Sequence, residues 1–314
     1  MQDTKKIAAL TPAVIIAGPT ASGKTACALA VAKEFNGTII NADAQQLYSE
    51  LSILTDRPGP EQLALPPHRL FGVLAADDPC SAGRWREMAL AEMQAASDAG
   101  RLPILVGGTG LYLKALLSGL SSIPPVPPEI RNEAAALYER LGHAQFQAEL
   151  AKRDPGMIDM PRDKQRLIRA YEVIAATAKP LRVWQQTADE TPLPYRFAVL
   201  VFDPPRETLY AAIERRFDRM MERGALEEAC RILALNLDPS LPAMKAVGLK
   251  ELISHLKGEM RLAEAVTKAK QSSRNYAKRQ VTWFRHQLPE AKRVPAQFSE
   301  SLEQEIFSFI RHSC

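Results

Sequence analysis

The feature that most constrains this chain is an eight-residue stretch fitting the pattern G-x-x-x-x-G-K-[ST]. The five residues Ala13–Ala17 before it read as a buried strand, and Ala26–Lys33 after it read as a helix. Glycines let the backbone wrap around an anion, and the N–H groups at the head of the helix favour negative charge. We therefore expect this stretch, the phosphate loop, to bind a phosphate compound through backbone N–H groups and an ammonium, with a hydroxyl for Mg²⁺. The residues of the phosphate loop are Gly18, Pro19, Thr20, Ala21, Ser22, Gly23, Lys24 and Thr25.

Length and composition are those of an ordinary soluble enzyme. With 314 residues, of which 46% are hydrophobic and 24% charged, the chain can bury a sizeable core in one large domain plus a smaller one. The net charge of +4 is mild evidence for an anionic partner. The four cysteines are scattered without a C-x-x-C pair, so we expect neither a zinc site nor disulfides, and reduced thiols in a cytoplasmic protein.

Targeting and membrane segments are not expected. The apolar run near the N-terminus leads directly into the phosphate loop, so cleavage of a signal peptide there would destroy the site. No apolar segment approaches the roughly 20 residues that a membrane span needs. We therefore expect no membrane partner.

The order of strand-like and helical segments predicts a helical insertion in a parallel sheet. Strand patterns at 37–42 and 103–106 precede a Pro-rich linker at 121–128, and only helical patterns follow up to about residue 186. A strand pattern returns at 195–203, before helices at 206–223, 226–235, 245–256 and 262–285 and a weakly patterned tail. The expected fold class is α/β, with a P-loop NTPase-like parallel sheet core formed by 1–121 and 195–314 and an all-helical insertion domain at 122–194.

Two strand ends carry candidate catalytic side chains. Asp43 follows the second strand, and ligands of open α/β sheets sit at the carboxyl ends of strands, so it should face the same crevice as the phosphate loop. It could act as a general base, bind Mg²⁺ or only cap a helix. Thr109 lies within Gly107–Gly110, where glycines permit close backbone approach. Asp203, after the strand at 195–202, is either a metal ligand or, more simply, a strand end.

Basic residues form further candidate surfaces. Arg215 and Arg216 are either surface charges or reach the bound phosphates. Two other groups of basic residues either bind a nucleic-acid backbone or form solvated faces. In the second group, the solvated face would lie above a buried aromatic stripe. The first comprises Arg162, Lys164, Arg166 and Arg169, and the second comprises Lys268, Lys270, Arg274, Lys278, Arg279 and Arg285 with Tyr276, Trp283 and Phe284. The histidines show no ligand spacing, so histidine metal sites are not expected.

Taken together, these stretches resemble the tRNA dimethylallyltransferase (tRNA isopentenyltransferase) family. The resemblance runs in family order from about residue 14 to residue 286. The matching segments are the phosphate loop, Asn41–Tyr48, Pro67–Leu70, Val106–Tyr112, Asp163–Ala170, Lys245–Gly248 and Tyr276–Arg285.

The resemblance implies transfer of a dimethylallyl group from dimethylallyl diphosphate to N6 of the adenosine adjacent to the anticodon in tRNA. It implies Mg²⁺, with Thr25 as its ligand, Asp43 and Thr109 in catalysis, and Arg216 with the phosphate loop on the diphosphate. It further implies that the insertion grips the anticodon stem-loop. The implied tRNA contacts are Asp43, Ala44, Gln45, Gln46, Thr109, Arg131, Gln165, Arg166, Leu167, Ile168, Arg169, Lys245, Ala246, Val247, Gly248, Leu249 and Lys250.

The sequence departs from the family at two of these positions. Ala44 stands where the family usually has Ser, and Leu249 stands where a Tyr is common. Two other functions remain open: a small-molecule kinase that uses ATP with Asp203 on Mg²⁺, and an NTP-regulated RNA-binding protein without chemistry. We expect the protein to be a monomer.

Overall fold

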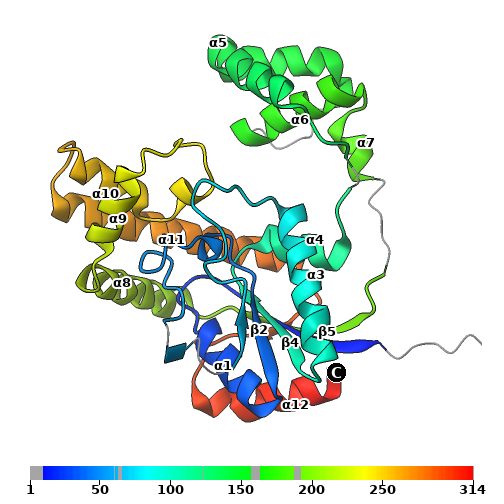
Figure 1. The fold of residues 1–314 in the computed structure, drawn as a ribbon, viewed down its shortest axis with the longest axis vertical. Coiled ribbons are helices and arrows are strands. Elements are labelled where there is room, and N and C mark those ends of the chain that lie inside the picture. The colour runs from blue at the N-terminus through cyan, green and yellow to red at the C-terminus, as the bar shows by residue number, and fades with distance from the viewer. Residues whose placement is uncertain are drawn as a thin grey trace, which may run out of the picture. The chain divides into compact units, whose positions relative to one another are not determined.

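The computed structural model describes residues 10–59, 61–62, 66–121, 123–156, 163–186 and 192–313. Residues 1–9, Ser122 of the predicted linker and Arg162 of the basic cluster lie outside this described part. The described chain divides into two compact units (Figure 1). The first contains the described residues up to Leu116 and from Leu193 onward, and the second spans Leu117–Pro192.

The first unit is built on a six-stranded sheet in which every strand pair is parallel. The strands follow the order β3-β2-β4-β1-β5-β6. Their bounds are β1 Thr11–Ala17, β2 Gly37–Asn41, β3 His68–Arg69, β4 Leu102–Gly107, β5 Tyr195–Phe202 and β6 Lys292–Val294. Strand β1 lies between β4 and β5 and is buried from Ala13 to Ala17, as expected for a central strand covered on both faces. The predicted P-loop-like parallel sheet is therefore confirmed.

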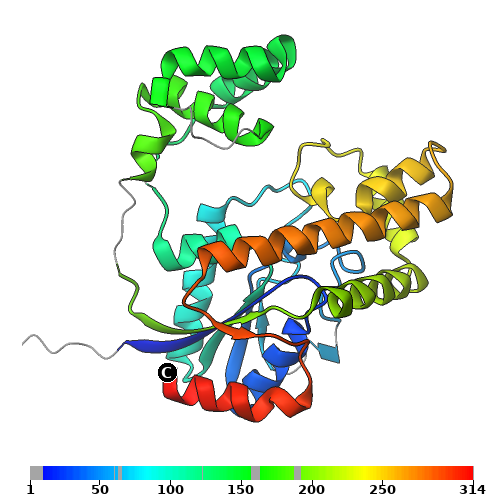
Figure 2. The same cartoon turned by 180° about the vertical axis from the view of Figure 1, so that it is seen from behind.

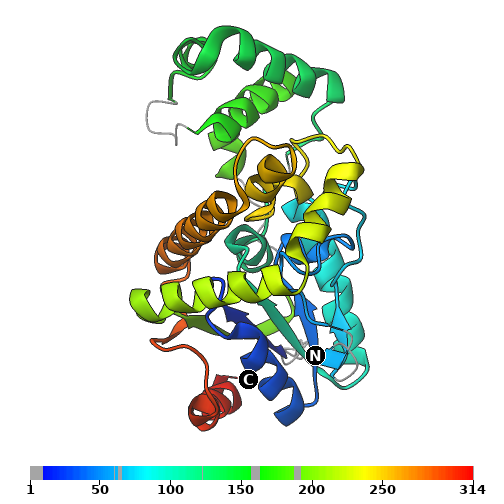
Figure 3. The same ribbon diagram turned by 90° about the vertical axis from the view of Figure 1, so that its left-hand side faces the viewer.

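Helices cover the sheet. Helices α1 (Lys24–Glu34) and α12 (Glu303–Ser313) lie side by side, as Figure 3 shows, and bury Val31 and Ile306 against strand residues such as Ile16. Helix α3 (Ala82–Asp98) packs on β2 and β4, and α4 (Gly110–Ser118) follows β4.

A second group of helices follows β5. It comprises α8 (Arg206–Glu222), α9 (Ala225–Ala234), α10 (Leu249–Leu256) and α11 (Leu262–Gln287). Helices α8 and α11 pack on each other through Leu209, Ile213 and Ala277, and Figure 2 shows α11 as the long helix of this group. The 3₁₀ turns η1 (Gln45–Leu47), η3 (Ala243–Lys245) and η4 (Glu300–Leu302) complete this unit.

The regular secondary structure of the second unit is helical, apart from one isolated bridge residue at Ser121, within its described residues. It contains α5 (Pro128–Arg153), which is interrupted at Gly142 (φ 70°), α6 (Lys164–Thr177) and α7 (Leu181–Gln185). Phe146, Leu167 and Tyr171 are buried in a core of its own. The all-helical insertion predicted from the loss of strand patterns after the Pro-rich linker is therefore confirmed.

Three segments differ from the sequence-based expectation. Residues 245–256 do not form one helix, because Gly248 takes a left-handed conformation (φ 92°) and α10 begins only at Leu249. The weakly patterned tail contains β6 and α12. The segment between the strand patterns at 37–42 and 103–106, where no further strand is expected, contains β3. These two strands have only three and two residues, too few for a period-two pattern to be recognised.

Candidate active site

The phosphate loop connects β1 to α1. Its conformation depends on Gly23, which has φ 88° at the N-cap of α1, and on Gly18, which has φ 149°. A Cβ atom at Gly23 would lie 2.8 Å from Cβ of Phe298, so both the backbone angle and the space require glycine. The loop therefore places its N–H groups at the head of α1.

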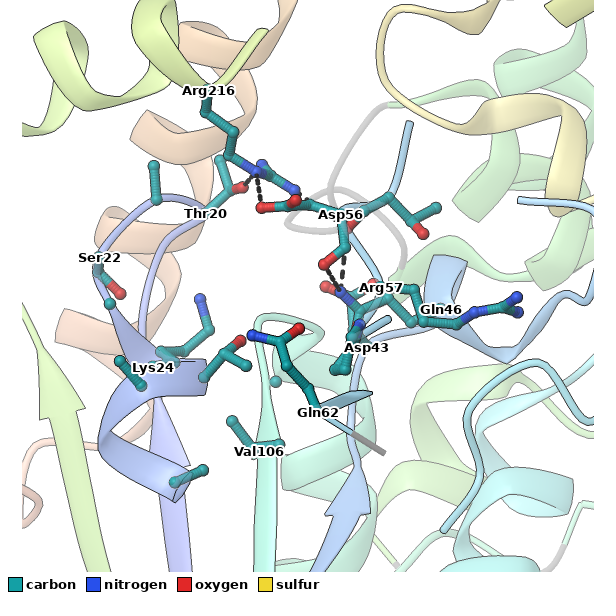
Figure 4. A pocket seen from close by; sticks show the side chains of 18 of the residues that line it. Thr20, Ser22, Lys24, Asp43, Gln46, Asp56, Arg57, Gln62, Val106 and Arg216 are labelled. Atoms are coloured by element: carbon teal, nitrogen blue, oxygen red, sulfur yellow. Dashed lines mark hydrogen bonds and ion pairs between the residues drawn. The ribbon is translucent and has the colours of Figure 1, made fainter. Parts of the chain in front are cut away.

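A cavity of about 490 Å³ opens above the phosphate loop (Figure 4). The loop lines one side from Thr20 to Thr25, and α8 together with its C-cap residue contributes arginines to the same cavity. The hydroxyl of Ser22 is fully buried and has no hydrogen-bond partner in the described residues. An orphan hydroxyl and backbone N–H groups around one cavity make a site suited to an anion. The arginines are Arg215, Arg216, Arg219 and Arg223.

Lys24 supplies the ammonium of this cavity. Its Nζ donates a hydrogen bond to the carbonyl of Pro19 at 2.6 Å. Burial lowers the pKa of Lys24 to about 8, with Asp43 raising it and Arg216 lowering it further. The amine therefore has little solvation to lose, and a bound anion would favour its protonated form.

Arg216 is held beside the phosphate loop by three contacts. Its guanidinium donates to the Thr20 hydroxyl, to the carbonyl of Thr55 at 3.0 Å and, through Nε, to Asp56 at 2.9 Å. Asp56 also pairs with Arg223 at 3.1 Å. Arg216 is therefore not a free surface charge but lies beside the phosphate loop, and its contact with a bound phosphate stays a prediction.

Asp43 lines the same cavity from the end of β2. Its backbone N–H donates to Asn41 Oδ1 at 2.8 Å, and its Oδ1 accepts from the N–H of Gln45 at 3.0 Å. One of its two carboxylate oxygens is thus hydrogen-bonded to the turn that follows β2, and Asp43 is not the N-cap of η1, which is Ala44. The Thr109 hydroxyl accepts from the N–H of Ala44 at 2.9 Å, which fixes the β4 turn against the residue that follows Asp43.

A second, smaller cavity of about 50 Å³ adjoins the first. Both cavities are lined by Thr20, Asp43, Thr55 and Arg216. The remaining wall of the small cavity is mostly apolar and comprises Leu54, Ile213, Phe217, Met220 and Val247, with Gln45, Ser273 and Tyr276. Asp43 therefore lies where a cavity lined by the phosphate loop and arginines meets a mostly apolar one.

Tyr276 is one of the aromatic residues singled out on α11, and it is half-buried and lines the small cavity. Its pKa is raised by burial and by the charge of Asp43. The aromatic residues of α11 are therefore partly core, as the second reading of that helix expected.

Gln280 was not predicted as a site residue. Its Oε1 accepts from the N–H of Thr20 at 2.9 Å, and its Nε2 donates to the carbonyl of Gly108 at 2.9 Å. It ties the phosphate loop to the turn that carries Thr109. One signal was available in the sequence, because Gln280 is a polar residue on the buried stripe of α11 that includes Ala277 and Phe284.

The predicted basic surface of α11 is partly neutralised. Lys268, Lys270, Arg274 and Arg285 pair with carboxylates. Lys278 and Arg279 have no carboxylate partner among the described residues and line a surface hollow with Trp283 and His286. Asp203 pairs with both Nε and Nη2 of Arg285, at 3.0 and 3.1 Å, which makes it a strand end tied to α11.

The predicted tRNA contacts lie on both units. In the helical unit Arg131, Gln165 and Arg166 are exposed and Ile168 and Arg169 are half-buried, whereas Leu167 is buried in the core. In the first unit Lys245 and Lys250 are exposed, Ala246, Gly248 and Leu249 are buried, and Val247 lines the small cavity. Gln45 Nε2 donates to the carbonyl of Pro242 at 3.1 Å, and Gln46 Nε2 donates to that of Thr55 at 2.9 Å.

Metal-ligand clusters and membrane helices were also sought in the described part of the chain. No group of three or more His, Cys, Asp or Glu side chains there could hold a metal ion. Among those residues, no helix combines the length and the apolar character needed to cross a membrane.

The comparisons with known proteins agree with one another. The family model described as IPP transferase matches residues 46–287, and that described as Isopentenyl transferase matches residues 12–71. The tRNA dimethylallyltransferase of Rhodospirillum centenum is 53% identical over 285 residues, covering 90% of this chain and 91% of the relative. That of Paramagnetospirillum magneticum is 51% identical, covering 96% of both chains.

Solved structures show the same fold. The full-length tRNA isopentenylpyrophosphate transferase of Bacillus halodurans superposes with a TM-score of 0.69 at 29% identity, covering 96% of this chain and 97% of that one. A eukaryotic dimethylallyltransferase acting on tRNA reaches a TM-score of 0.82 at 23% identity, covering 97% of this chain and 80% of that one. The resemblance inferred from the motifs is confirmed, and the chain belongs to the IPP transferase family, whose curated members include the tRNA dimethylallyltransferases.

Proposed function

We propose that this protein is a prenyltransferase that moves a dimethylallyl group from dimethylallyl diphosphate to N6 of the adenosine adjacent to the anticodon in tRNA, releasing diphosphate. One observation carries this proposal. Asp43 lies on the boundary between the anion cavity, with Lys24 and Arg216, and the small apolar cavity. The anion cavity suits the diphosphate leaving group, and the small apolar cavity suits the five-carbon chain. The carboxylate of Asp43 lies between them, where it could take a proton from the attacking nitrogen.

The chemistry requires one bond to form and one to break. The N6 nitrogen attacks C1 of the dimethylallyl group, the C1–O bond to the diphosphate breaks, and the N6 proton passes to the carboxylate of Asp43. Negative charge accumulates on the diphosphate, where backbone N–H groups of the phosphate loop, Lys24 and Arg216 stabilise it. The Thr109 hydroxyl holds the backbone next to Asp43 and so keeps this carboxylate in place.

Mg²⁺ fits this arrangement as an ion carried by the diphosphate. The described residues contain no group of three His, Cys, Asp or Glu side chains that could hold a metal ion, so they do not form a complete metal cage. Mg²⁺ commonly keeps few protein ligands and binds substrate phosphates. Thr25, at the head of α1 and in the cavity wall, would hold the ion, which would neutralise charge on the diphosphate.

We further propose that tRNA is bound by exposed or half-buried basic residues of both units. The helical unit would grip the anticodon stem-loop through Arg131, Arg166 and Arg169, and the first unit would contribute Lys245 and Lys250. Such contacts to the phosphate backbone make affinity fall as salt rises. We also propose a cytoplasmic monomer: the phosphate loop, Asp43 and Arg216 all belong to the first unit, so the proposed chemistry needs no residue from a second copy.

The kinase alternative is less consistent with the site. It requires Asp203 to hold Mg²⁺, and this carboxylate is paired with Arg285 and is not among the residues that line the cavity. A non-catalytic RNA-binding protein would not need a carboxylate beside the anion site.

The experiment combines purified protein, radiolabelled dimethylallyl diphosphate, Mg²⁺ and an anticodon stem-loop carrying the candidate adenosine. We expect label to appear in the RNA, and only in RNA that has this adenosine. A stem-loop with guanosine at that position is the matched control. Release of phosphate from ATP at enzyme-like rates, without label in RNA, would instead establish the kinase.

A further inference from the structure

Glu228 is a buried carboxylate that the proposed chemistry does not use. It lies on α9, and its side chain is fully inaccessible to solvent. Buried carboxylates are costly unless they are hydrogen-bonded, so the partners of Glu228 indicate what it does.

The side-chain hydrogen bonds of Glu228 within the described residues all go to one short segment that we call the 52–57 turn, residues Ser52–Arg57. Oε2 accepts from the backbone N–H of Ser52 at 2.8 Å, from the Ser52 hydroxyl at 3.0 Å and from the N–H of Ile53 at 2.8 Å. Oε1 accepts from the N–H of Leu54 at 2.8 Å. Three consecutive backbone N–H groups therefore point at one side chain, as in the backbone nests that bind anions.

The same turn holds the arginine of the diphosphate site. Its two next residues, Thr55 and Asp56, supply the carbonyl and the carboxylate that bind Arg216 at 3.0 and 2.9 Å (Figure 4). Asp56 has a left-handed backbone conformation (φ 53°) that a non-glycine residue rarely adopts. Hydrogen bonds from the N–H of Asp56 to Ile53 and from that of Arg57 to Ser52 close the turn.

We infer that Glu228 is a positioning residue for diphosphate binding, acting through the 52–57 turn on Arg216. The carboxylate fixes Ser52, Ile53 and Leu54, and this fixes the orientation of Thr55 and Asp56. Arg216 is thereby directed at Thr20 of the phosphate loop before any ligand arrives, which lowers the ordering cost of binding. This inference rests on the proposed role of Arg216 as a diphosphate ligand.

The ionised carboxylate is specifically suited to this position. It offers only acceptor oxygens, and the turn presents only donors. In Glu228→Gln one oxygen is replaced by an NH₂ group, which would face backbone N–H groups and leave at least one of them unpaired. Glu227→Gln is the matched control, because it removes the same charge from the adjacent residue of α9, and no hydrogen bond from Glu227 to the turn is present.

The test measures the affinity of the full-length protein for inorganic diphosphate with Mg²⁺ by calorimetry. We expect Glu228→Gln to weaken diphosphate binding about tenfold, which corresponds to the free energy of one charge-assisted hydrogen bond. We expect no change of this affinity in Glu227→Gln. The affinity for an anticodon stem-loop should not change in either variant. Glu228→Asp keeps the charge on a shorter side chain and should lose less affinity than Glu228→Gln. If Glu228→Gln shows no thermal unfolding transition, and so is not folded, Glu228→Asp takes its place in the test.

A double-mutant cycle separates positioning from a general loss of structure. In an Arg216→Ala background, Glu228→Gln should weaken diphosphate binding by less than about twofold, because the side chain through which it acts is gone. An unchanged affinity in the single variant, or an undiminished tenfold loss in the Arg216→Ala background, would overturn the inference. Inorganic diphosphate can bind without any prenyl transfer, so the two proposals can fail separately. If the wild-type protein binds diphosphate but modifies no RNA, the proposed function is refuted, and the double-mutant cycle can still be measured.

Discussion

Gln280 and Thr20 are joined by a hydrogen bond of 2.9 Å between residues 260 positions apart in the sequence. Because the other end of the same amide donates to the carbonyl of Gly108, one side chain of α11 sets the distance between the phosphate loop and the β4 turn. The shape of the anion cavity thus depends on Gln280 of α11, although this side chain does not itself line the cavity.

The first prediction concerns this amide. In Gln280→Glu the carboxylate still accepts from Thr20, but it cannot donate to Gly108 and it adds negative charge beside the phosphate loop. We expect kcat/KM for dimethylallyl diphosphate to fall by about tenfold or more, since a buried acceptor loses its partner. Gln271→Glu, the same change on the exposed face of α11, is the control and should leave kcat/KM unaltered.

The second prediction concerns pH. Because burial lowers the pKa of Lys24 to about 8, the free protein loses this positive charge as pH rises through 8. Diphosphate binds the protonated amine, so its affinity should be flat below pH 7 and fall by up to about tenfold per pH unit above 8. Calorimetric titrations from pH 6 to pH 9.5 measure this. In Lys24→Arg the charge persists over the whole range, and a fall that remained in that variant would assign the titration to another group.

The third prediction concerns the small apolar cavity. If it holds the dimethylallyl chain, Met220→Ala should enlarge it and raise the kcat/KM of geranyl diphosphate relative to dimethylallyl diphosphate by about tenfold. Met221→Ala removes the same atoms from a residue outside that cavity and is the control. Equal selectivity in the two variants would place the prenyl chain elsewhere.

The fourth prediction concerns RNA binding by the helical unit. Arg131 is exposed, so Arg131→Gln should weaken stem-loop binding and reduce the slope of log affinity against log salt by about one. Lys33→Gln removes the same charge from an exposed residue of α1 in the first unit and should change neither the affinity nor the slope. A slope that stayed the same in Arg131→Gln would remove this arginine from the interface.

Local patterns explain which parts of the site were predictable. The phosphate loop lies between its own strand and helix, and Asp43 follows directly on a strand, so short-range patterns place both at one edge of a parallel sheet. Gln280, Asp56 and Glu228 were missed because each acts on residues about 160 to 260 positions away, and no local pattern encodes such pairing.

The basic residues of α11 show the same limit. Their spacing left a nucleic-acid surface and a solvated face equally open. In the structure, carboxylates of another element, Asp218 and Glu214 of α8, pair with Lys270 and Arg274. Helix periodicity indicates which side chains are exposed, but it does not reveal which charges are paired. Only the tertiary structure shows that, of the basic residues singled out on α11, Lys278 and Arg279 are the two without a carboxylate partner in the described part of the chain.

The central claim is that Asp43 removes the N6 proton while the phosphate loop holds the departing diphosphate. The most direct test is the single-turnover rate of Asp43→Asn, since asparagine can still accept from the N–H of Gln45 and so preserves the local turn. We predict a rate lower by about 10²–10⁴-fold, with the affinities for diphosphate and stem-loop within about threefold of the wild type. An Asp43→Asn protein that transfers the dimethylallyl group at the wild-type rate would contradict the account.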